Sequence, residues 1–189
     1  MNYKLYHTSA FVNNSTDVFI PTIPKYAMKG EDTSILRVCL SDAIKHCLMS
    51  SSTCREALDN GQKLFKVYEF DIDSQFIVGP KDLYNSCKVM DALLYLEHWC
   101  IKDCVPISVF DIEVKSYSTD YGLCVNPRKT TEYNKYLKKL KRAENCMDYD
   151  LCDKLYDSAI ENEIFFQILV LEDLKYYRLD SRFQKLSLF

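Results

Sequence analysis

The apolar and polar positions near the start of the chain follow two periods in turn. Residues 2–7 alternate as in a strand. Residues 11–32 contain Pro21, Pro24, Gly30 and clusters of polar residues, which predict a loop. Residues 35–41 are mostly apolar and β-branched, which is typical of a buried strand. From residue 43 the apolar positions repeat at helical spacing, with Ser41 or Asp42 expected to cap the helix. The pattern therefore predicts a strand that ends at Ser41 and turns directly into a helix.

The next part of the chain reads mainly as strands. Residues 50–61 are expected to finish the helix and turn, and residues 81–92 predict a short helix or an irregular connection. Three further strands are predicted, at residues 64–70, 94–101 and 108–114, and the last has the most regular alternation in the chain.

The composition changes after Ser116. Residues 118–129 are polar and contain Gly122 and Asn126-Pro127, and Thr131 is expected to cap a helix that runs to about Asn145. Asp148 or Asp150 is expected to open a second helix that ends near Ile160. Two strands are then predicted, at residues 163–171 and 175–179.

These elements predict an α+β protein with a single domain over residues 1–189. The core sheet is expected in residues 1–116, a helical hairpin is expected as an insertion at 117–162, and residues 163–189 are expected to return as strands to the sheet.

Composition and charge exclude several classes. The chain has 189 residues and a net charge of −3, which argues against a general nucleic-acid binder or a membrane-surface protein. It has 4 glycines and no glycine-rich phosphate loop, so a P-loop kinase or a Rossmann dehydrogenase is not expected. The basic residues between Lys135 and Arg142 fit a solvated helix face, and also a surface for a nucleic-acid or acidic-protein partner.

The cysteines favour a reducing environment. There are nine of them, several inside apolar runs, and none form a Cys-x-x-Cys pair, so no metal site is expected. No signal peptide and no apolar run of membrane-spanning length is recognised. We therefore expect a cytoplasmic protein without a membrane partner.

Two charged side chains lie where chemistry is plausible. Arg37 and the Ser41 hydroxyl are expected at the start of a helix, where an anionic ligand is favoured. Alternatively, Arg37 pairs with Glu31 or Asp32. Glu97 lies in an apolar and aromatic run, where an ionised carboxylate requires a partner, a cleft or an exposed edge strand.

Three motifs, taken together, resemble a known family. They are Tyr-His-Thr-Ser ending at Ser9, Arg-Val-Cys-Leu-Ser ending at Ser41 before a helix, and Glu-His-Trp beginning at Glu97. Their types and order resemble the ADP-ribosyltransferase-like fold, and in particular small members from bacteria and their phages. The resemblance covers roughly the first two-thirds of the chain.

The resemblance implies a split, strongly bent antiparallel sheet with flanking helices and a cleft that holds NAD as a substrate. Glu97 would be the catalytic carboxylate, which stabilises the positive charge that builds on the ribose as the nicotinamide bond breaks. Five residues would bind the cofactor: His7 at the adenosine-side ribose, Thr8 at the nicotinamide side, Arg37 at the pyrophosphate, Ser41 as a brace, and Tyr95 stacked on the nicotinamide from the same sheet face as Glu97.

The implied function is transfer of ADP-ribose to an unknown acceptor, or hydrolysis of NAD. A second reading is a catalytically inactive module of the same fold that binds a nucleotide or a host or phage protein. A third is an interaction domain whose function lies in the helices at residues 130–160. The enzyme reading requires His7, Ser41 and Glu97 to face one another across a shared crevice.

Overall fold

The computed structural model describes residues 1–13, 16–25, 27 and 31–179. The expected loop at 11–32 and the expected returning strands at 163–189 lie partly outside these residues. The chain forms two compact units. One contains residues 1–120 together with the segment from Leu169 onward, and the other contains Tyr121–Ile168.

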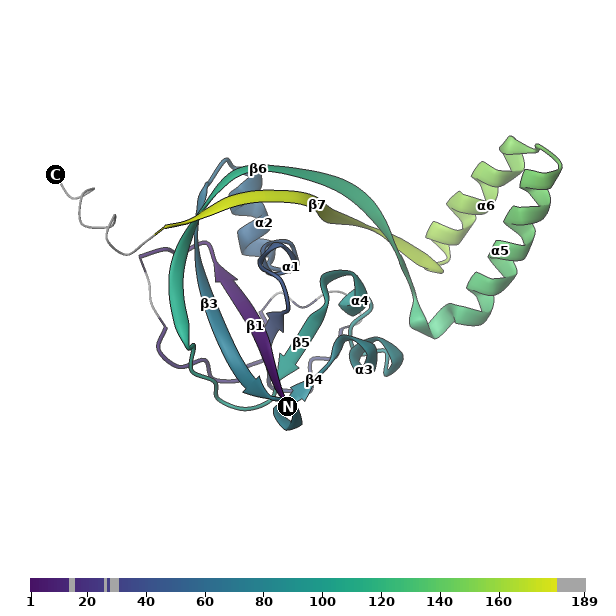
Figure 1. The fold of residues 1–189 in the computed structure, drawn as a ribbon. Coiled ribbons are helices and arrows are strands. Elements are labelled where there is room, and N and C mark those ends of the chain that lie inside the picture. Colours follow the sequence, from purple (N-terminus) through teal and green to yellow (C-terminus); the bar gives the residue numbers. More distant parts are fainter. Residues whose placement is uncertain (14–15, 26, 28–30, 180–189) are drawn as a thin grey trace. The chain divides into compact units, whose positions relative to one another are not determined.

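In the part of the chain that the structure describes, seven strands form one antiparallel sheet, in the order β4-β5-β2-β1-β3-β6-β7 (Figure 1). With the helices, it makes the protein α+β, as the periodicity predicts. The strands are β1 (Asn2–Ser9), β2 (Val38–Ser41), β3 (Leu64–Asp73), β4 (Ile77–Val78), β5 (Glu97–Cys100), β6 (Ser108–Val125) and β7 (Phe165–Leu179).

The sheet is narrowest between β1 and β2. These two strands pair at one position, Tyr6 with Ser41, whereas β1 and β3 pair along the whole of Asn2–Ser9. The strands β4, β5 and β2 are therefore joined to β1, β3, β6 and β7 through a single residue pair, and β1 and β2 separate on either side of it.

The helix after β2 does not begin as expected. Helix α1 (Ile44–Ser50) has Ala43 as its N-cap, without a capping side chain. The Ser41 hydroxyl donates instead to the Tyr95 carbonyl at 2.7 Å, and Asp42 contacts His46 at 3.3 Å. The expectation that Ser41 or Asp42 caps this helix is wrong, because both side chains have other partners.

Residues 50–61 also differ from the expected helix tail and turn. They contain a second helix, α2 (Ser52–Asp59), whose N-cap Ser51 accepts from the backbone N–H of Cys54 at 3.3 Å. A short helix was expected near residue 81, and α3 (Pro80–Asn85) follows a single-turn helix at Ser74–Phe76.

The strand expected at 94–101 is shorter. Residues Ala92–Tyr95 form helix α4, and Leu96 ends it in the left-handed region at φ 46°. Strand β5 therefore begins at Glu97 rather than containing it in the middle. Ala92, the first residue of α4, packs in a buried cluster with Leu83 and Trp99. This packing overrides the β-propensity of the segment that follows.

The unit Tyr121–Ile168 contains the ends of β6 and β7 and a helical hairpin. Its helices are a single-turn helix at Pro127–Lys129, α5 (Thr130–Asn145) and α6 (Tyr149–Glu161). Tyr136, Ala159 and Phe165 are buried together as a core of its own. Asp148 caps α6 by accepting from the backbone N–H of Leu151 at 3.1 Å, as expected.

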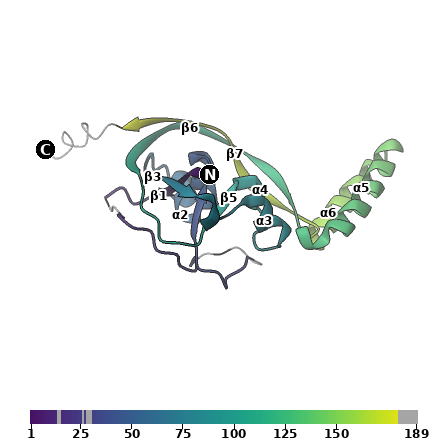
Figure 2. The ribbon, with the colours of Figure 1, turned by 60° about the horizontal axis from the view of Figure 1, so that its bottom comes forward.

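The helical hairpin expected at 117–162 begins later, because the polar residues at its start belong to β6, which continues to Val125. The two strands expected after residue 163 are one strand, β7. β6 and β7 run side by side in both ribbon views (Figure 2). Their backbone groups satisfy each other, so a polar sequence can remain extended.

Candidate functional site

The strand register places Ser41 and Glu97 together and separates them from His7. Tyr6 pairs with Ser41, and Ser41 pairs with Glu97, so these three side chains point to one side of the sheet. Successive residues of a strand alternate, so His7 points to the other side. The expectation that His7, Ser41 and Glu97 face one another across a crevice is therefore wrong.

His7 fills the gap where β1 and β2 separate. Its Nδ1 lies 3.2 Å from the carbonyl oxygen of Cys39 on β2, and its ring packs edge-on against Phe19 with centroids 5.1 Å apart. Burial lowers the pKa of His7, which favours a neutral imidazole whose Nδ1–H donates to this carbonyl. His7 thus supplies a hydrogen bond that β1 backbone pairing no longer provides.

Glu97 is a buried carboxyl group with 9% of its surface exposed. Its Oε1 accepts from the Trp99 indole N–H at 2.7 Å, and the Cys39 side chain forms a second hydrogen bond with it. Burial, and then the charge of nearby Asp91, raise the pKa of Glu97 to about 7. The alternative that Glu97 is exposed to water on an edge strand is wrong, because its side chain is buried.

Arg37 is buried, and its guanidinium binds other residues of the protein. Its guanidinium forms an ion pair with Glu31 and stacks on the Trp99 ring, with 3.8 Å to the ring centroid. It also donates to the carbonyl oxygens of Asp32 at 2.8 Å and Ile35 at 3.0 Å. The alternative that Arg37 pairs with Glu31 is confirmed, and its side chain is too buried to meet a pyrophosphate.

The remaining candidate residues also have internal partners. Thr8 Oγ1 contacts Cys54 Sγ at 3.6 Å, and the Ser41 hydroxyl is bonded to the Tyr95 carbonyl. The Tyr95 hydroxyl donates to the Leu169 carbonyl at 2.7 Å. Tyr95 belongs to α4 rather than to β5, so the expectation that it shares a sheet face with Glu97 is wrong.

The structure adds two features that the sequence analysis missed. Asp91 is buried near Glu97, and burial raises its pKa to about 6. Its position inside the apolar run at residues 89–94 is the sequence signal that could have marked it, as a similar run marked Glu97. A groove also opens between α5 and α6, lined on the α5 side by residues 132, 135, 136 and 139. Their i, i+3, i+4, i+7 spacing places them on one face of α5 and is visible in the sequence.

Comparisons with known protein families, with curated proteins and with solved structures find no match for this chain. Within the described residues, no helix is long and apolar enough to cross a membrane. Among the same residues, no three His, Cys, Asp or Glu side chains are grouped so that they could hold a metal ion.

Proposed function

We propose that this protein is a binding protein without NAD turnover, which recognises another protein through its α5–α6 hairpin. The observation that carries the proposal is that every candidate NAD-site residue is held by the chain itself. His7, Thr8, Arg37, Ser41, Tyr95 and Glu97 each contact another residue of this protein.

The scaffold proposed is an inactive relative of the ADP-ribosyltransferase-like fold. The single pair between β1 and β2 is consistent with the split sheet that the three motifs imply, and Glu97 lies at the start of β5 beside Ser41. The imidazole, however, points to the opposite side of the sheet from the carboxyl. Catalysis by preorganised groups requires them to converge on the same reacting atoms, and this arrangement does not supply that convergence.

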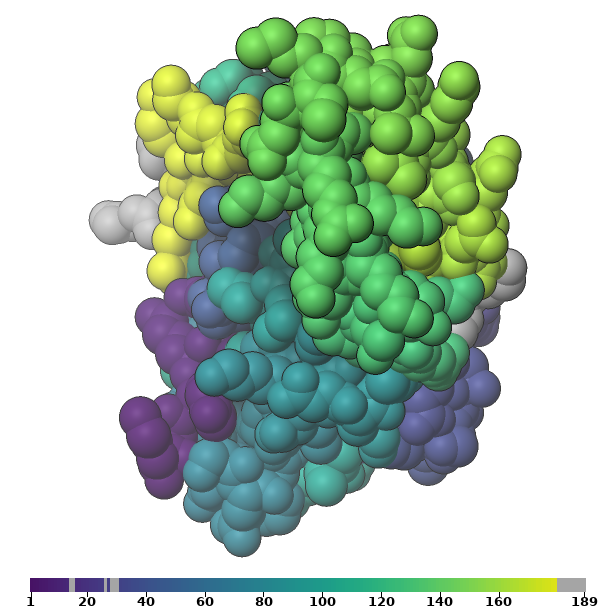
Figure 3. Space-filling view, turned by 90° about the vertical axis from the view of Figure 1, so that its right-hand side faces the viewer, coloured from purple at the N-terminus to yellow at the C-terminus, as the bar shows by residue number. Residues whose placement is uncertain are grey.

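The hairpin is favoured as the binding element because it exposes groups that interfaces use. Met147 and Tyr149, at the turn between the helices, are 76% and 70% exposed, and Leu151 follows them. Exposed Tyr, Met and Leu side chains in one place are typical of contact surfaces. The two helices also pack against each other with a core of their own, so the hairpin can present a fixed surface (Figure 3).

The proposal is tested by removing the hairpin. In the variant, residues 127–163 are replaced by Asn-Gly, because a two-residue turn of this type joins antiparallel strands such as β6 and β7. Full-length protein and variant are used side by side to capture partners from lysate of the producing cells. We expect at least one protein to be enriched by the full chain and lost with the variant. Equal capture by both proteins, or none by either, contradicts the proposal.

A second candidate function is NAD cleavage, either by transfer of ADP-ribose to an acceptor or by hydrolysis. It is favoured by one observation, the buried carboxyl of Glu97 beside Ser41. Burial raises the pKa of this carboxyl, and perturbed carboxyls concentrate at active sites. Nicotinamide release from NAD is measured with wild type and Glu97→Gln. Release that falls ~10²-fold or more in Glu97→Gln would establish this candidate. Under the binding-protein proposal, neither protein releases nicotinamide above the buffer rate.

A further inference from the structure

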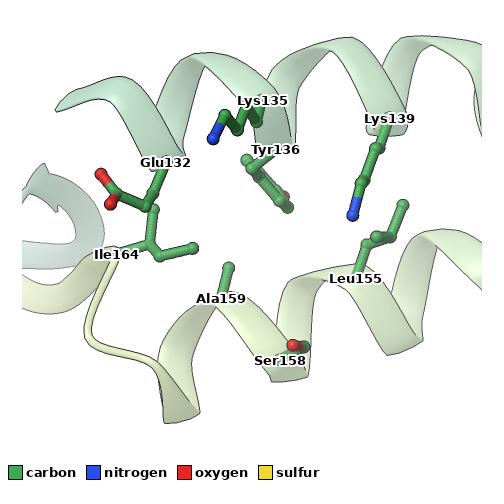
Figure 4. Close-up of a pocket in the computed structure, with 8 residues that line it drawn as sticks. All are labelled: Glu132, Lys135, Tyr136, Lys139, Leu155, Ser158, Ala159 and Ile164. Carbon is green, nitrogen blue, oxygen red and sulfur yellow. The ribbon is translucent and has the colours of Figure 1, made fainter. Parts of the chain in front are cut away.

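The groove between α5 and α6 has an apolar floor. Tyr136 and Lys139 extend from α5 toward α6, and Leu155 and Ala159 extend from α6 toward α5 (Figure 4). Ala159 is small and lies between the two helices at the base of this space, and Ile164 closes one end. This space can accept an apolar side chain from outside.

The size of the groove indicates what kind of group it holds. It encloses about 210 Å³, less than the ~300–1,000 Å³ of sites that bury a drug-sized ligand. One or two aliphatic side chains fill such a space, whereas a dinucleotide does not. The groove therefore suits the anchor residues of a peptide.

The rim of the groove is positively charged on the α5 side. Lys135 and Lys139 are exposed and one helical turn apart, about 6 Å along the axis. Among the described residues, neither lysine has a carboxylate within ion-pair distance. Lys138, Lys141 and Arg142, also exposed on α5, extend the positive potential along this helix.

Two neighbouring features limit the charge of the occupant. Glu132 lies at the end of the groove, three residues from Lys135, and α6 carries Asp150, Asp153 and Asp157. A long polyanion would meet these carboxylates, so a nucleic-acid strand is disfavoured. A short segment with a few acidic side chains beside α5 avoids them.

We propose that the groove binds an acidic amphipathic helix of a partner protein. Leucine-like side chains enter the space above Ala159, and two carboxylates at positions i and i+4 of the helix pair with Lys135 and Lys139. A helix matches because its i, i+4 spacing is also about 6 Å, and residues i+3 and i+7 then lie on the same face as the carboxylates. This inference rests on the proposed function of the hairpin and names the partner's chemistry.

The probe is a fluorescent helical peptide of about 15 residues with Glu at i and i+4 and Leu at i+3 and i+7. Its binding to the full-length protein is followed by anisotropy. We expect Lys135→Glu/Lys139→Glu to weaken binding at least tenfold, since two attractions become repulsions. The matched control Lys138→Glu/Lys141→Glu changes the same charge on the same helix outside the groove, and it should weaken binding less than about threefold.

A second arm tests the apolar floor. Replacing both Leu residues of the peptide by Gln should abolish binding, and Ser158→Trp, which narrows the groove without changing charge, should weaken it at least tenfold. Circular dichroism and thermal melting verify that each variant is folded. Ser158 is exposed, so this substitution leaves the core of the hairpin intact.

Three outcomes overturn the proposal. The first is no binding of the peptide up to ~1 mM. The second is an equal loss of binding in the two charge-reversed variants, which would mean general attraction to α5. The third is tighter binding of a single-stranded oligonucleotide than of the peptide. If the hairpin captures a partner that Lys135→Glu/Lys139→Glu still binds, the groove is refuted while the proposed function stands.

Discussion

Arg37 and Glu97 show, at the scale of single residues, how two charges assigned to a ligand can serve the interior instead. The guanidinium lies on the Trp99 ring and pairs with Glu31, while the carboxyl accepts from the indole N–H of the same Trp99. One aromatic residue thus orients both charged groups. Removing the guanidinium takes away both the ion pair of Glu31 and the cation that stacks on Trp99.

The first prediction concerns Arg37. Arg37→Met leaves Glu31 beside an apolar side chain, so the free energy of unfolding should fall by about 3–5 kcal/mol. Arg37→Lys keeps the charge but loses the planar stacking and the fork of donors. In this variant the free energy of unfolding should fall by a smaller amount, about 1–3 kcal/mol. Urea unfolding measures both. A fall of less than ~0.5 kcal/mol in Arg37→Met would mean that Arg37 does not stabilise the fold, and it would again be a candidate for binding an anionic ligand.

The second prediction concerns the protonation of Glu97. Its pKa is about 7 in the folded protein and lower in the unfolded chain, whose ordinary value is 4.5. Between these values the folded state holds more protons, so this group makes stability fall as pH rises from about 4.5 to about 7. Glu97→Gln removes the titration. The unfolding free energy of the variant minus that of wild type should therefore be larger at pH 8 than at pH 5, by roughly 2–3 kcal/mol.

Denaturant unfolding of both proteins at the two pH values measures this difference. Asp91 also has a raised pKa, about 6, and is present in both proteins, so only the part of its titration that is coupled to the Glu97 charge differs between them. A difference that does not change with pH would mean that Glu97 is ionised in the folded state throughout this range.

At the scale of elements, the α5–α6 hairpin depends on how its first helix ends. The backbone N–H groups of Met147 and Asp148 bond the carbonyl oxygens of Glu144 and Ala143 at 2.9 and 3.0 Å, which is the Schellman arrangement. Met147 is in the left-handed region at φ 55°, where a side chain is disfavoured. The turn is therefore sharp but strained at an exposed residue.

The third prediction follows from this turn. Met147→Gly should stabilise the protein by about 0.5–1 kcal/mol, because glycine adopts this conformation without strain and little packing is lost. Met147→Ala is the matched control, since it removes the same side chain but keeps the strain, and its effect should be smaller. Thermal melting compares the two variants. Equal melting temperatures would show that the strain is not significant.

At the scale of the whole molecule, the chain divides into two units whose cores share no residues. The core of the sheet unit includes Leu5, Leu40 and Phe70, and that of the hairpin unit includes Tyr136 and Phe165. Long strands β6 and β7 pass through both. Each unit buries its own apolar surface, so the sheet does not need the hairpin in order to fold.

The fourth prediction tests this independence. The variant in which Asn-Gly replaces residues 127–163 should unfold cooperatively, with a melting temperature within ~5 °C of the full-length protein's sheet transition. Calorimetry together with the near-ultraviolet signal of Trp99 measures that transition. Loss of the cooperative transition would mean that the sheet unit requires the hairpin.

The sequence by itself determined the elements whose periodicity is strong and local. The strand ending at Ser41, the helix after it, the alternation at 108–114 and the capping of α6 by Asp148 are all present. In each case the residues that decide the structure are close together in the sequence. The α+β class follows from these elements.

Only the tertiary structure decided which side of the sheet each candidate side chain occupies. The pairing of Tyr6 with Ser41 and of Ser41 with Glu97 depends on a register between distant strands, and a shift of one residue reverses every side chain. The pairing of Arg37 with Trp99 and the helix at Ala92–Tyr95 likewise depend on packing between segments far apart in sequence. Local periodicity does not encode such long-range contacts, so the motifs could suggest a site but not its geometry.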